Sequence, residues 1–297
     1  MNAADVMATT VATLVEAIEA GAGEWRMPWH HTGTIGMPVN AATGQPYSGG
    51  NVLALWGAAF AHGWPTQQWA TYKQWASLGA QVRKGETGTG AIYWKVKPAE
   101  TITEVDETTG EEVELTSAAR VQWARSFTLF NAAQVDGWTT TNTTGEVEAG
   151  PLADWFANIP ARVLWGAGDP CYRPAADVVV MPAPDAFRHD ESRWATLAHE
   201  LAHWTGHPSR LNRVFGKRFG DDAYAAEELV AELSSAFTCA TLGIPTEART
   251  DHAAYLASWC RVLKTDPGIL WSVAGKASAA TNHLASYQPA TVGEQAA

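Results

Sequence analysis

Apolar side chains recur at helical spacing along much of the chain, and each such stretch predicts an amphipathic helix. In residues 3–21 they lie three or four positions apart, and two glycines end the pattern. The same spacing predicts helices over residues 51–62 and 66–78, which are separated by Gly63-Trp64-Pro65. The chain is therefore expected to begin with three helices.

Further along, apolar and polar positions alternate, which is typical of strands. Residues 91–97 predict one strand, and residues 126–131 predict a second that returns beside it. The intervening residues 99–117 carry seven acidic side chains together with Thr and Gly, so we expect an exposed hairpin or loop there. This part of the chain therefore predicts a small antiparallel sheet.

Helical spacing returns in the second half of the chain. It predicts helices near residues 152–159, from 190 or 192 to 206, 221–243, 250–264 and 267–284. A short apolar run at residues 177–182 predicts one buried strand, and the polar, low-complexity stretch 139–150 predicts a linker. We therefore predict an α+β protein with a first domain at 1–140, a linker at 141–150, a mostly helical second domain at 151–288 and a flexible tail at 289–297.

Bulk composition narrows the function classes. The chain has 297 residues with 46% hydrophobic content, enough for two cores, and residues 1–22 lack the basic start of a secretory signal. Cys171, Cys239 and Cys260 are odd in number and lack metal-type spacing, so we expect reduced thiols in a cytoplasmic protein. The net charge of −11 argues against bulk attraction to nucleic acid or to an anionic membrane, and we expect no membrane partner.

The helix predicted at 190–206 contains H-E-x-x-H, a signature of zinc proteases. His199 and His203 are four residues apart, so on a helix they lie one turn above each other and can share a metal ion. Glu200 lies beside them, where it can act as a general base. A five-residue pattern also occurs by chance, and without a third ligand it would be only a solvated helix face.

The next helix offers that third ligand. Glu228 and Glu232 are four residues apart beside an apolar stripe, where two carboxylates are costly unless a cation lies opposite them. We predict Glu228 as the ligand and Glu232 as the residue that orients a ligating histidine, although swapped roles stay open. Glu227 is predicted to point elsewhere. Tyr224, one turn before Glu228, is a candidate to stabilise an oxyanion.

This arrangement separates two classes of zinc protease. One class needs a third histidine at the position of Ser209 and a methionine turn, yet no methionine follows Met181. The other class, the gluzincins, takes its third ligand from a Glu on a following helix, and this sequence fits it. We expect Zn²⁺, while another divalent transition metal would suit the same donors. In zinc proteases a strand beside the cleft commonly pairs with an extended substrate, which is the role expected for residues 177–182.

A basic run with interleaved aromatic residues lies in the first half. Cations that follow a phosphate backbone, with aromatic faces for bases, are the usual means of binding single-stranded nucleic acid. The alternative for any single tryptophan is a place in the hydrophobic core. The candidate nucleic-acid-binding residues are Lys73, Arg83, Lys84, Trp94 and Lys95.

Several longer stretches form a recognisable pattern when they are taken in order. In the first half they are Asn40 to Asn51, Trp69 to Gln74, Leu78-Gly79, Val82 to Glu86 and Phe130 to Gly137. In the second half they are Leu197 to Arg213 and Tyr224 to Glu232. On these stretches, and over about residues 3–285, the chain resembles the ArdC-type antirestriction proteins of plasmids, phages and other mobile elements.

The resemblance implies an N-terminal domain that binds single-stranded DNA and a C-terminal zincin-like metallopeptidase domain. By position it implies that His199, His203 and Glu228 are metal ligands and that Glu200 is the general base. The implied role is to shield incoming DNA from host restriction during transfer. The alternative is an active metallopeptidase that acts on DNA-associated proteins, such as a restriction component, with the first domain serving only for delivery.

Overall fold

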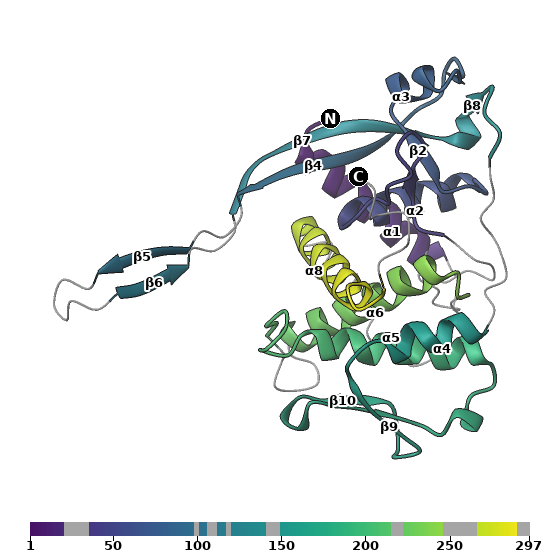
Figure 1. Cartoon of the computed structure of the whole chain (residues 1–297). Helices are drawn as coiled ribbons and strands as arrows, with labels where there is room; N and C mark the ends of the chain where they lie inside the picture. Colours follow the sequence, from purple (N-terminus) through teal and green to yellow (C-terminus); the bar gives the residue numbers. More distant parts are fainter. Residues whose placement is uncertain are drawn as a thin grey trace.

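The computed structural model describes residues 1–20, 36–97, 101–105, 112–116, 120–140, 149–214, 222–245 and 266–289. Within these residues, helices are combined with four small sheets, which confirms the predicted α+β class (Figure 1). The helix predicted at 250–264, most of the predicted linker and nearly all of the predicted tail lie outside the described residues.

The first half begins with α1 (Ala3–Ala20) and α2 (Gly50–His62), close to the predicted bounds. The helix predicted over 66–78 is wrong in its first part, because Gln68–Ala70 form strand β2 and only Tyr72–Ser77 form helix α3. Thr71 separates them: its side chain accepts a hydrogen bond from the Gln74 backbone N–H, and the Gln74 side chain accepts one from the Thr71 backbone.

The largest sheet has the strand order β1-β2-β7-β4, formed by Val39–Asn40, Gln68–Ala70, Arg120–Asn131 and Thr89–Lys97. Strands β4 and β7 are long and antiparallel, and β7 begins at Arg120 where the sequence predicted Ser126. They extend from the body toward the hairpin of β5 (Thr101–Val105) and β6 (Glu112–Thr116), as Figure 1 shows. We call β4 and β7 together the ribbon.

Smaller elements complete the first half and open the second. Strands β3 (Gln81–Val82) and β8 (Val135–Asp136) pair antiparallel beside the short 3-10 helix η1 (Ala132–Gln134). The second half starts with α4 (Ala149–Ala157). Two further 3-10 turns, η2 (Pro174–Ala176) and η3 (Pro184–Ala186), flank the strand that precedes the H-E-x-x-H helix.

The strand predicted near residues 177–182 is β11 (Val178–Met181), and all four of its residues are buried. It lies in the middle of a three-stranded sheet, parallel to β9 (Arg162–Trp165) and antiparallel to β10 (Cys171–Arg173). The expectation that this strand pairs with a substrate through an open edge is therefore wrong, because both of its edges already carry backbone hydrogen bonds. The sequence prediction missed β9 and β10, whose short exposed runs give little periodic signal.

Three long helices form the centre of the second half: α5 (Asp190–Thr205), α6 (Asp222–Leu242) and α8 (Pro267–Ala285). One side of α5 packs on a core that includes Leu152, Phe156 and Val179. In that core the ring of Trp194 stacks on Phe156 with centroids 4.9 Å apart. This packing fixes α5 against α4 and β11, and it leaves the opposite side of α5 to face α6.

The two halves of the chain share one hydrophobic core. Helices α1 and α2 contribute buried apolar side chains to it, and so do α6 and α8. Across this boundary the rings of Trp56 and Phe237 meet edge to face, with centroids 5.5 Å apart. The predicted domain limits stay a prediction, but this core joins the halves tightly. In the part of the chain that the structure describes, no helix is both long and apolar enough to span a membrane.

Candidate metal centre

The H-E-x-x-H residues lie on the face of α5 that packs against α6. Apolar side chains of α5, among them Leu197 and Leu201, point into the core on the other side. His199 and His203 are then one turn apart, and both are buried, with exposed fractions of 6% and 9%. Core packing behind the helix therefore directs both imidazoles toward α6.

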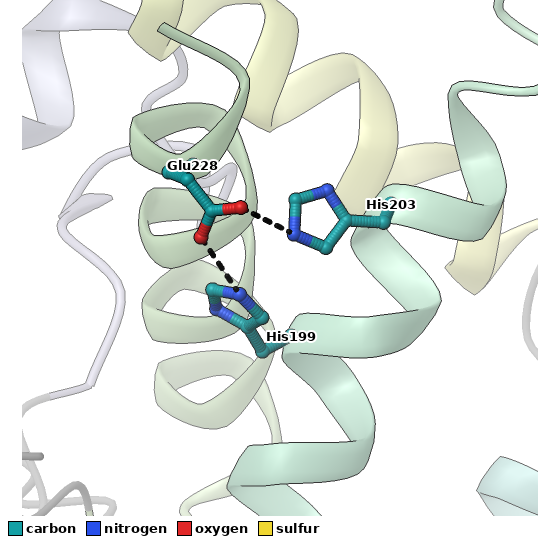
Figure 2. A group of neighbouring side chains, drawn as sticks. All are labelled: His199, His203 and Glu228. Carbon is teal, nitrogen blue, oxygen red and sulfur yellow. Dashed lines mark ion pairs between the residues drawn. The ribbon is translucent and has the colours of Figure 1, made fainter. Parts of the chain in front are cut away.

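Helix α6 presents Glu228 to this pair. The carboxylate Oε2 of Glu228 lies 3.6 Å from His199 Nε2, and its Oε1 lies 3.5 Å from His203 Nε2. Figure 2 shows the three side chains converging from the two helices. Potential ligand atoms of all three lie within 4.8 Å of one another. The residues that the sequence predicted as metal ligands are thus brought together at one point.

The donor set fits a divalent transition metal. Two imidazole nitrogens and one carboxylate are the protein ligands of many catalytic zinc sites, and they leave a fourth position open. Burial opposes ionisation of Glu228, but its hydrogen bond with His199 and the charges of both histidines outweigh that effect and lower its pKa to about 2. Glu228 is therefore ready as an anionic ligand at neutral pH.

The outer nitrogen of each histidine faces a further carboxylate. His199 Nδ1 lies 3.6 Å from Glu232 Oε2, and His203 Nδ1 lies 3.3 Å from Glu227 Oε1. Glu232 thus lies beside His199, and its role in orienting that histidine stays a prediction. The expectation that Glu227 points elsewhere is wrong, because Glu227 is 5% exposed and is directed at His203. His203 Nδ1 can therefore donate to Glu227 and keep Nε2 for a ligand, while Glu232 lies beside His199 Nδ1 beyond hydrogen-bond distance.

Arg213, which the sequence reasoning did not single out, holds Glu227 in place. Its Nη2 donates to Glu227 Oε1 at 2.8 Å and its Nε donates to Oε2 at 3.0 Å. The same guanidinium donates to the Ala202 carbonyl and to the Thr205 hydroxyl. Against the cost of burial, the hydrogen bonds with His203 and Arg213 lower the pKa of Glu227. No periodic signal could have found Arg213, because it lies in an irregular segment after α5.

The remaining predicted catalytic residues lie near this centre. Glu200 is 5% exposed and directly follows His199 on α5. Tyr224 lies one turn before Glu228 on α6, and its side-chain hydrogen bond helps to lower the pKa of Glu228. Their roles in chemistry stay predictions.

The predicted nucleic-acid-binding residues are dispersed over the first half. Lys73, Lys84 and Lys95 are exposed on α3, on the loop after β3 and on β4. Arg83 is also exposed, but it forms an ion pair with Glu86 at 2.8 Å and donates to the Ala133 carbonyl.

The aromatic residues separate into core and surface groups. Trp94 is half-buried and packs on the shared core, 6.5 Å from the ring of Trp271. By contrast, Tyr93 and Trp123 are exposed on the ribbon with ring centroids 5.6 Å apart. The sequence reasoning missed Trp123 because it started the returning strand at Ser126. Trp123 pairs with Lys95 on the opposite strand, so a returning strand long enough to reach Lys95 would have identified it.

Comparison with known proteins agrees with this architecture. Residues 4–130 match the family model of the N-terminal domain of anti-restriction factor ArdC, and residues 151–276 match that of a zincin-like metallopeptidase. The crystal structure of the metal-free antirestriction protein ArdC from plasmid R388 is 34% identical in sequence. It superposes with a TM-score of 0.74 over 95% of this chain and 97% of that one. The chain belongs to the ArdC family of antirestriction proteins.

Other similar proteins include a close match in length and a much longer relative. An uncharacterised protein of Sinorhizobium fredii, y4eC, is 42% identical over 92% of this chain and 89% of its own length. A DNA primase TraC of Escherichia coli is 36% identical over 95% of this chain, but the match spans only 27% of the primase. The Mn(II)-bound structure of R388 ArdC, 31% identical with a TM-score of 0.74, shows that a relative holds a divalent metal. A divalent metal, not zinc in particular, is what these likenesses support for this ArdC-family chain.

Proposed function

We propose that this antirestriction protein binds single-stranded DNA through its first half and holds a divalent metal ion, expected to be zinc, between His199, His203 and Glu228. The observation that carries the metal site is the convergence of these three buried or half-buried donors from two helices. The match to the ArdC N-terminal domain and the exposed lysines of the first half support DNA binding.

Metal analysis of the full, tag-free chain tests the site. Mass spectrometry should find near one divalent ion per wild-type chain, and Glu228→Ala should lose most of it because a ligand is removed. Glu200→Gln is the matched control and should keep the metal, since Glu200 is not expected to be a ligand. An empty wild-type protein that also takes up no added Zn²⁺ or Mn²⁺ would contradict the proposal.

Salt dependence tests the DNA half. Binding of the full chain to a labelled single strand should weaken as salt rises, because phosphate contacts release counterions. Lys84→Glu should weaken binding on any sequence. Lys84 is a better site for charge reversal than Arg83, whose guanidinium supports the local fold through Glu86 and Ala133. If Lys84→Glu binds single strands as tightly as the wild type does, Lys84 is not part of the DNA-binding surface.

The second candidate function is a metallopeptidase that acts on DNA-associated proteins, and the buried Glu200 beside the two histidines favours it. When bound, a metal ion in this site would supply Lewis acidity to polarise a peptide carbonyl and acidify water. Glu200 would accept the proton of the attacking water and return it to the leaving amine. Tyr224 would donate a hydrogen bond to the developing oxyanion.

Replacement of Glu200 separates the two candidates. Glu200→Gln should abolish cleavage of a protein substrate, such as a restriction component, because glutamine cannot accept a proton at neutral pH. Protection of incoming DNA by this variant at the wild-type level would assign the antirestriction role to DNA binding alone. Cleavage retained by the variant would instead rule out this mechanism.

A further inference from the structure

Four side chains form a compact group on one face of the ribbon: Tyr93, Lys95, Trp123 and Arg125. Tyr93 pairs in register with Arg125, and Lys95 pairs with Trp123. The two rings therefore lie on one diagonal, 5.6 Å apart and tilted by 46°, and the two cations lie on the other. We call this group the ribbon quartet.

The quartet lies at the exposed end of one face of the sheet, and the part of that face next to α2 is buried. On the same face, Ala91 and Leu129 are fully buried against α2. Beyond α2 the face is uncovered, and Tyr93 and Trp123 are 57% and 46% exposed. The other face of the ribbon is occupied, since Ile92 and Trp94 pack on the shared core. Only one side of the ribbon thus presents its aromatic rings to solvent.

Charge on the ribbon is opposite in sign to that of the whole protein. The sequences of β4 and β7 contain four basic residues and no acidic residue, in a chain of net charge −11. Lys95 and Arg125 are exposed, and within the described part of the chain neither takes part in an ion pair. A local cationic surface on an acidic protein points to an anionic partner.

Resting on the proposed DNA binding, we infer that the ribbon quartet is the surface on which single-stranded DNA binds. Bases stack on the faces of Tyr93 and Trp123, and Lys95 and Arg125 bind the flanking phosphates. Free bases are required, because in a duplex both faces of each base are already stacked. Of the residues predicted by sequence, Lys95 belongs to the quartet, and the Lys84→Glu variant tests whether the bound strand also reaches the loop after β3.

Anisotropy of labelled oligo(dT) with the full chain tests the aromatic pair. The double variant Tyr93→Ala/Trp123→Ala should raise Kd by at least about tenfold, because loss of one base stack costs roughly fivefold or more in affinity. Val96→Ala/Val121→Ala is the matched control. These two exposed valines pair with each other on the same ribbon, and strand alternation directs Val96 away from the quartet. The control should bind as the wild type does.

Salt titration tests the cations. Lys95→Ala/Arg125→Ala should reduce the slope of log K against log salt by about 1.4, since each phosphate contact on a single strand contributes about 0.7. Unlabelled duplex of the same sequence should compete poorly. Equal competition by the duplex would overturn base stacking on the quartet.

The outcomes distinguish this inference from the function on which it rests. If the aromatic double variant binds oligo(dT) as tightly as the wild type does, the quartet is refuted while DNA binding by the protein stands. Failure of the wild type to bind any single strand would refute both. Thermal melting of each variant shows whether a loss of binding reflects a loss of fold.

A separate observation concerns the metal centre. Arg213 and Glu227 are both buried, with side-chain exposures of 7% and 6%, and they are joined by two hydrogen bonds. The Glu227 carboxylate in turn contacts His203 Nδ1 at 3.3 Å. A buried charge pair with both carboxylate oxygens engaged is rigid, because any movement breaks charge-assisted bonds.

Resting on the proposed metal site, we infer that Glu227 and Arg213 act as a positioning pair for His203. Glu227 holds the proton on Nδ1 and so directs the Nε2 lone pair to the metal. Arg213 acts through Glu227, by balancing its charge and holding its carboxylate at the imidazole, and the Ala202 carbonyl in turn anchors the guanidinium. Neither residue touches the metal or a substrate.

Metal affinity, measured by competition with a chelating dye, tests this pair. Glu227→Gln should weaken Zn²⁺ and Mn²⁺ binding by about 10- to 100-fold while the fold is kept. Arg213→Ala should weaken binding too, but it should cause no further loss in a chain that already carries Glu227→Gln. Glu191→Gln, exposed on the first turn of α5, is the matched control and should change nothing.

Three results would overturn the positioning pair. Wild-type affinity in Glu227→Gln would show that His203 needs no such partner. Additive losses from Arg213→Ala and Glu227→Gln would show that Arg213 does not act through Glu227. A wild-type chain that binds no metal would contradict the proposed metal site itself. Should Arg213→Ala fail to fold, Glu227→Gln still decides, because it preserves the side-chain volume.

Discussion

At the scale of single residues, burial sets the chemistry of the cysteines. Cys239 lies inside α6 with no exposed surface, and burial raises the pKa of its thiol to about 12. Cys171 on β10 is only half-buried. Because the thiolate is the reactive form, these two positions should differ strongly in reactivity.

We therefore expect iodoacetamide at pH 8 to alkylate Cys171 in the folded chain and to leave Cys239 unmodified. Both should react in denaturant. Peptide mass spectrometry reads each site separately. Similar labelling of the two cysteines in the folded chain would contradict the burial of Cys239.

The residues of the metal centre show which contacts helical periodicity can predict and which it cannot. The four-residue spacing of His199 and His203, and the placement of Glu228 beside an apolar stripe, could be read from the sequence. The contacts of Glu227 could not, because periodicity gives a face of α6 without saying how α5 crosses it. His203 meets Glu227 while His199 meets Glu232, so the two helices run antiparallel here. This crossing gives each imidazole its own carboxylate.

At the scale of elements, an ion pair joins Asp177 in the β10–β11 connection to Arg210 in the segment after α5, and we call it the clasp. Arg210 donates through both terminal nitrogens to the Asp177 carboxylate, and its guanidinium lies 3.9 Å over the ring of Trp204. The Tyr172 hydroxyl donates to Asp177 as well. The hydrogen bond from Arg210, opposed by burial, lowers the pKa of Asp177. The clasp thereby fixes the sheet beside the helix that carries both histidines.

A pKa lowered in the folded state gives stability that is present above the carboxyl's ordinary pKa and is lost as pH falls through the folded value. Asp177→Asn should therefore lower the free energy of unfolding by about 1 kcal/mol at pH 7, and the difference from wild type should shrink toward pH 3. Asparagine tolerates the left-handed backbone of this position, where φ is 48°. Urea unfolding across this pH range measures the effect.

Asp185→Asn, on an exposed turn before α5, is the matched control for the clasp. It should leave stability unchanged at every pH. A loss for Asp177→Asn that stays constant down to pH 3 would show that the charge of Asp177 is not the source of its stabilisation.

At the scale of the whole molecule, the two halves meet where α2 approaches α8. A methyl group added at Gly50 would lie 2.2 Å from ring atoms of Trp271, so only glycine allows this contact. Gly50→Ala must displace the ring or the helix, and we expect a loss of about 1–3 kcal/mol in the free energy of unfolding. Denaturant unfolding of the full chain measures it.

Gly275→Ala, in α8, should have the opposite effect on stability. Gly275 is exposed in α8 and a methyl group there would meet nothing within 4 Å. The substitution should stabilise the chain by about 0.5–1 kcal/mol, because alanine loses less backbone entropy in a helix. A Gly50→Ala chain as stable as wild type would show that the two halves are less tightly packed than this contact implies.

The shared core also predicts a single cooperative unfolding transition. Residues of α1 and α2 lose their buried surface if α6 and α8 unfold, and the reverse holds equally. Calorimetry should therefore give one peak whose calorimetric and van't Hoff enthalpies agree. Two separated peaks would mean that each half is stable without the other.

Elements whose signal is local could be predicted from the amino-acid sequence alone. The H-E-x-x-H helix, the acidic helix after it and the long strands at 91–97 and 126–131 follow from periodicity, which depends only on neighbours along the chain. The same reasoning misassigned residues 68–70, because Trp69 is placed in a strand by its pairing with Asn131, far away in sequence.

The relations between elements became visible in the folded chain. Folding made β11 a central strand, joined both halves in one core, directed Glu227 to His203 and Arg213 to Glu227, and brought Trp123 beside Tyr93 on the ribbon. The physical reason is common to all four. Each relation depends on a contact between two separate segments, whose geometry comes from packing and strand register and leaves no periodic trace in either segment alone.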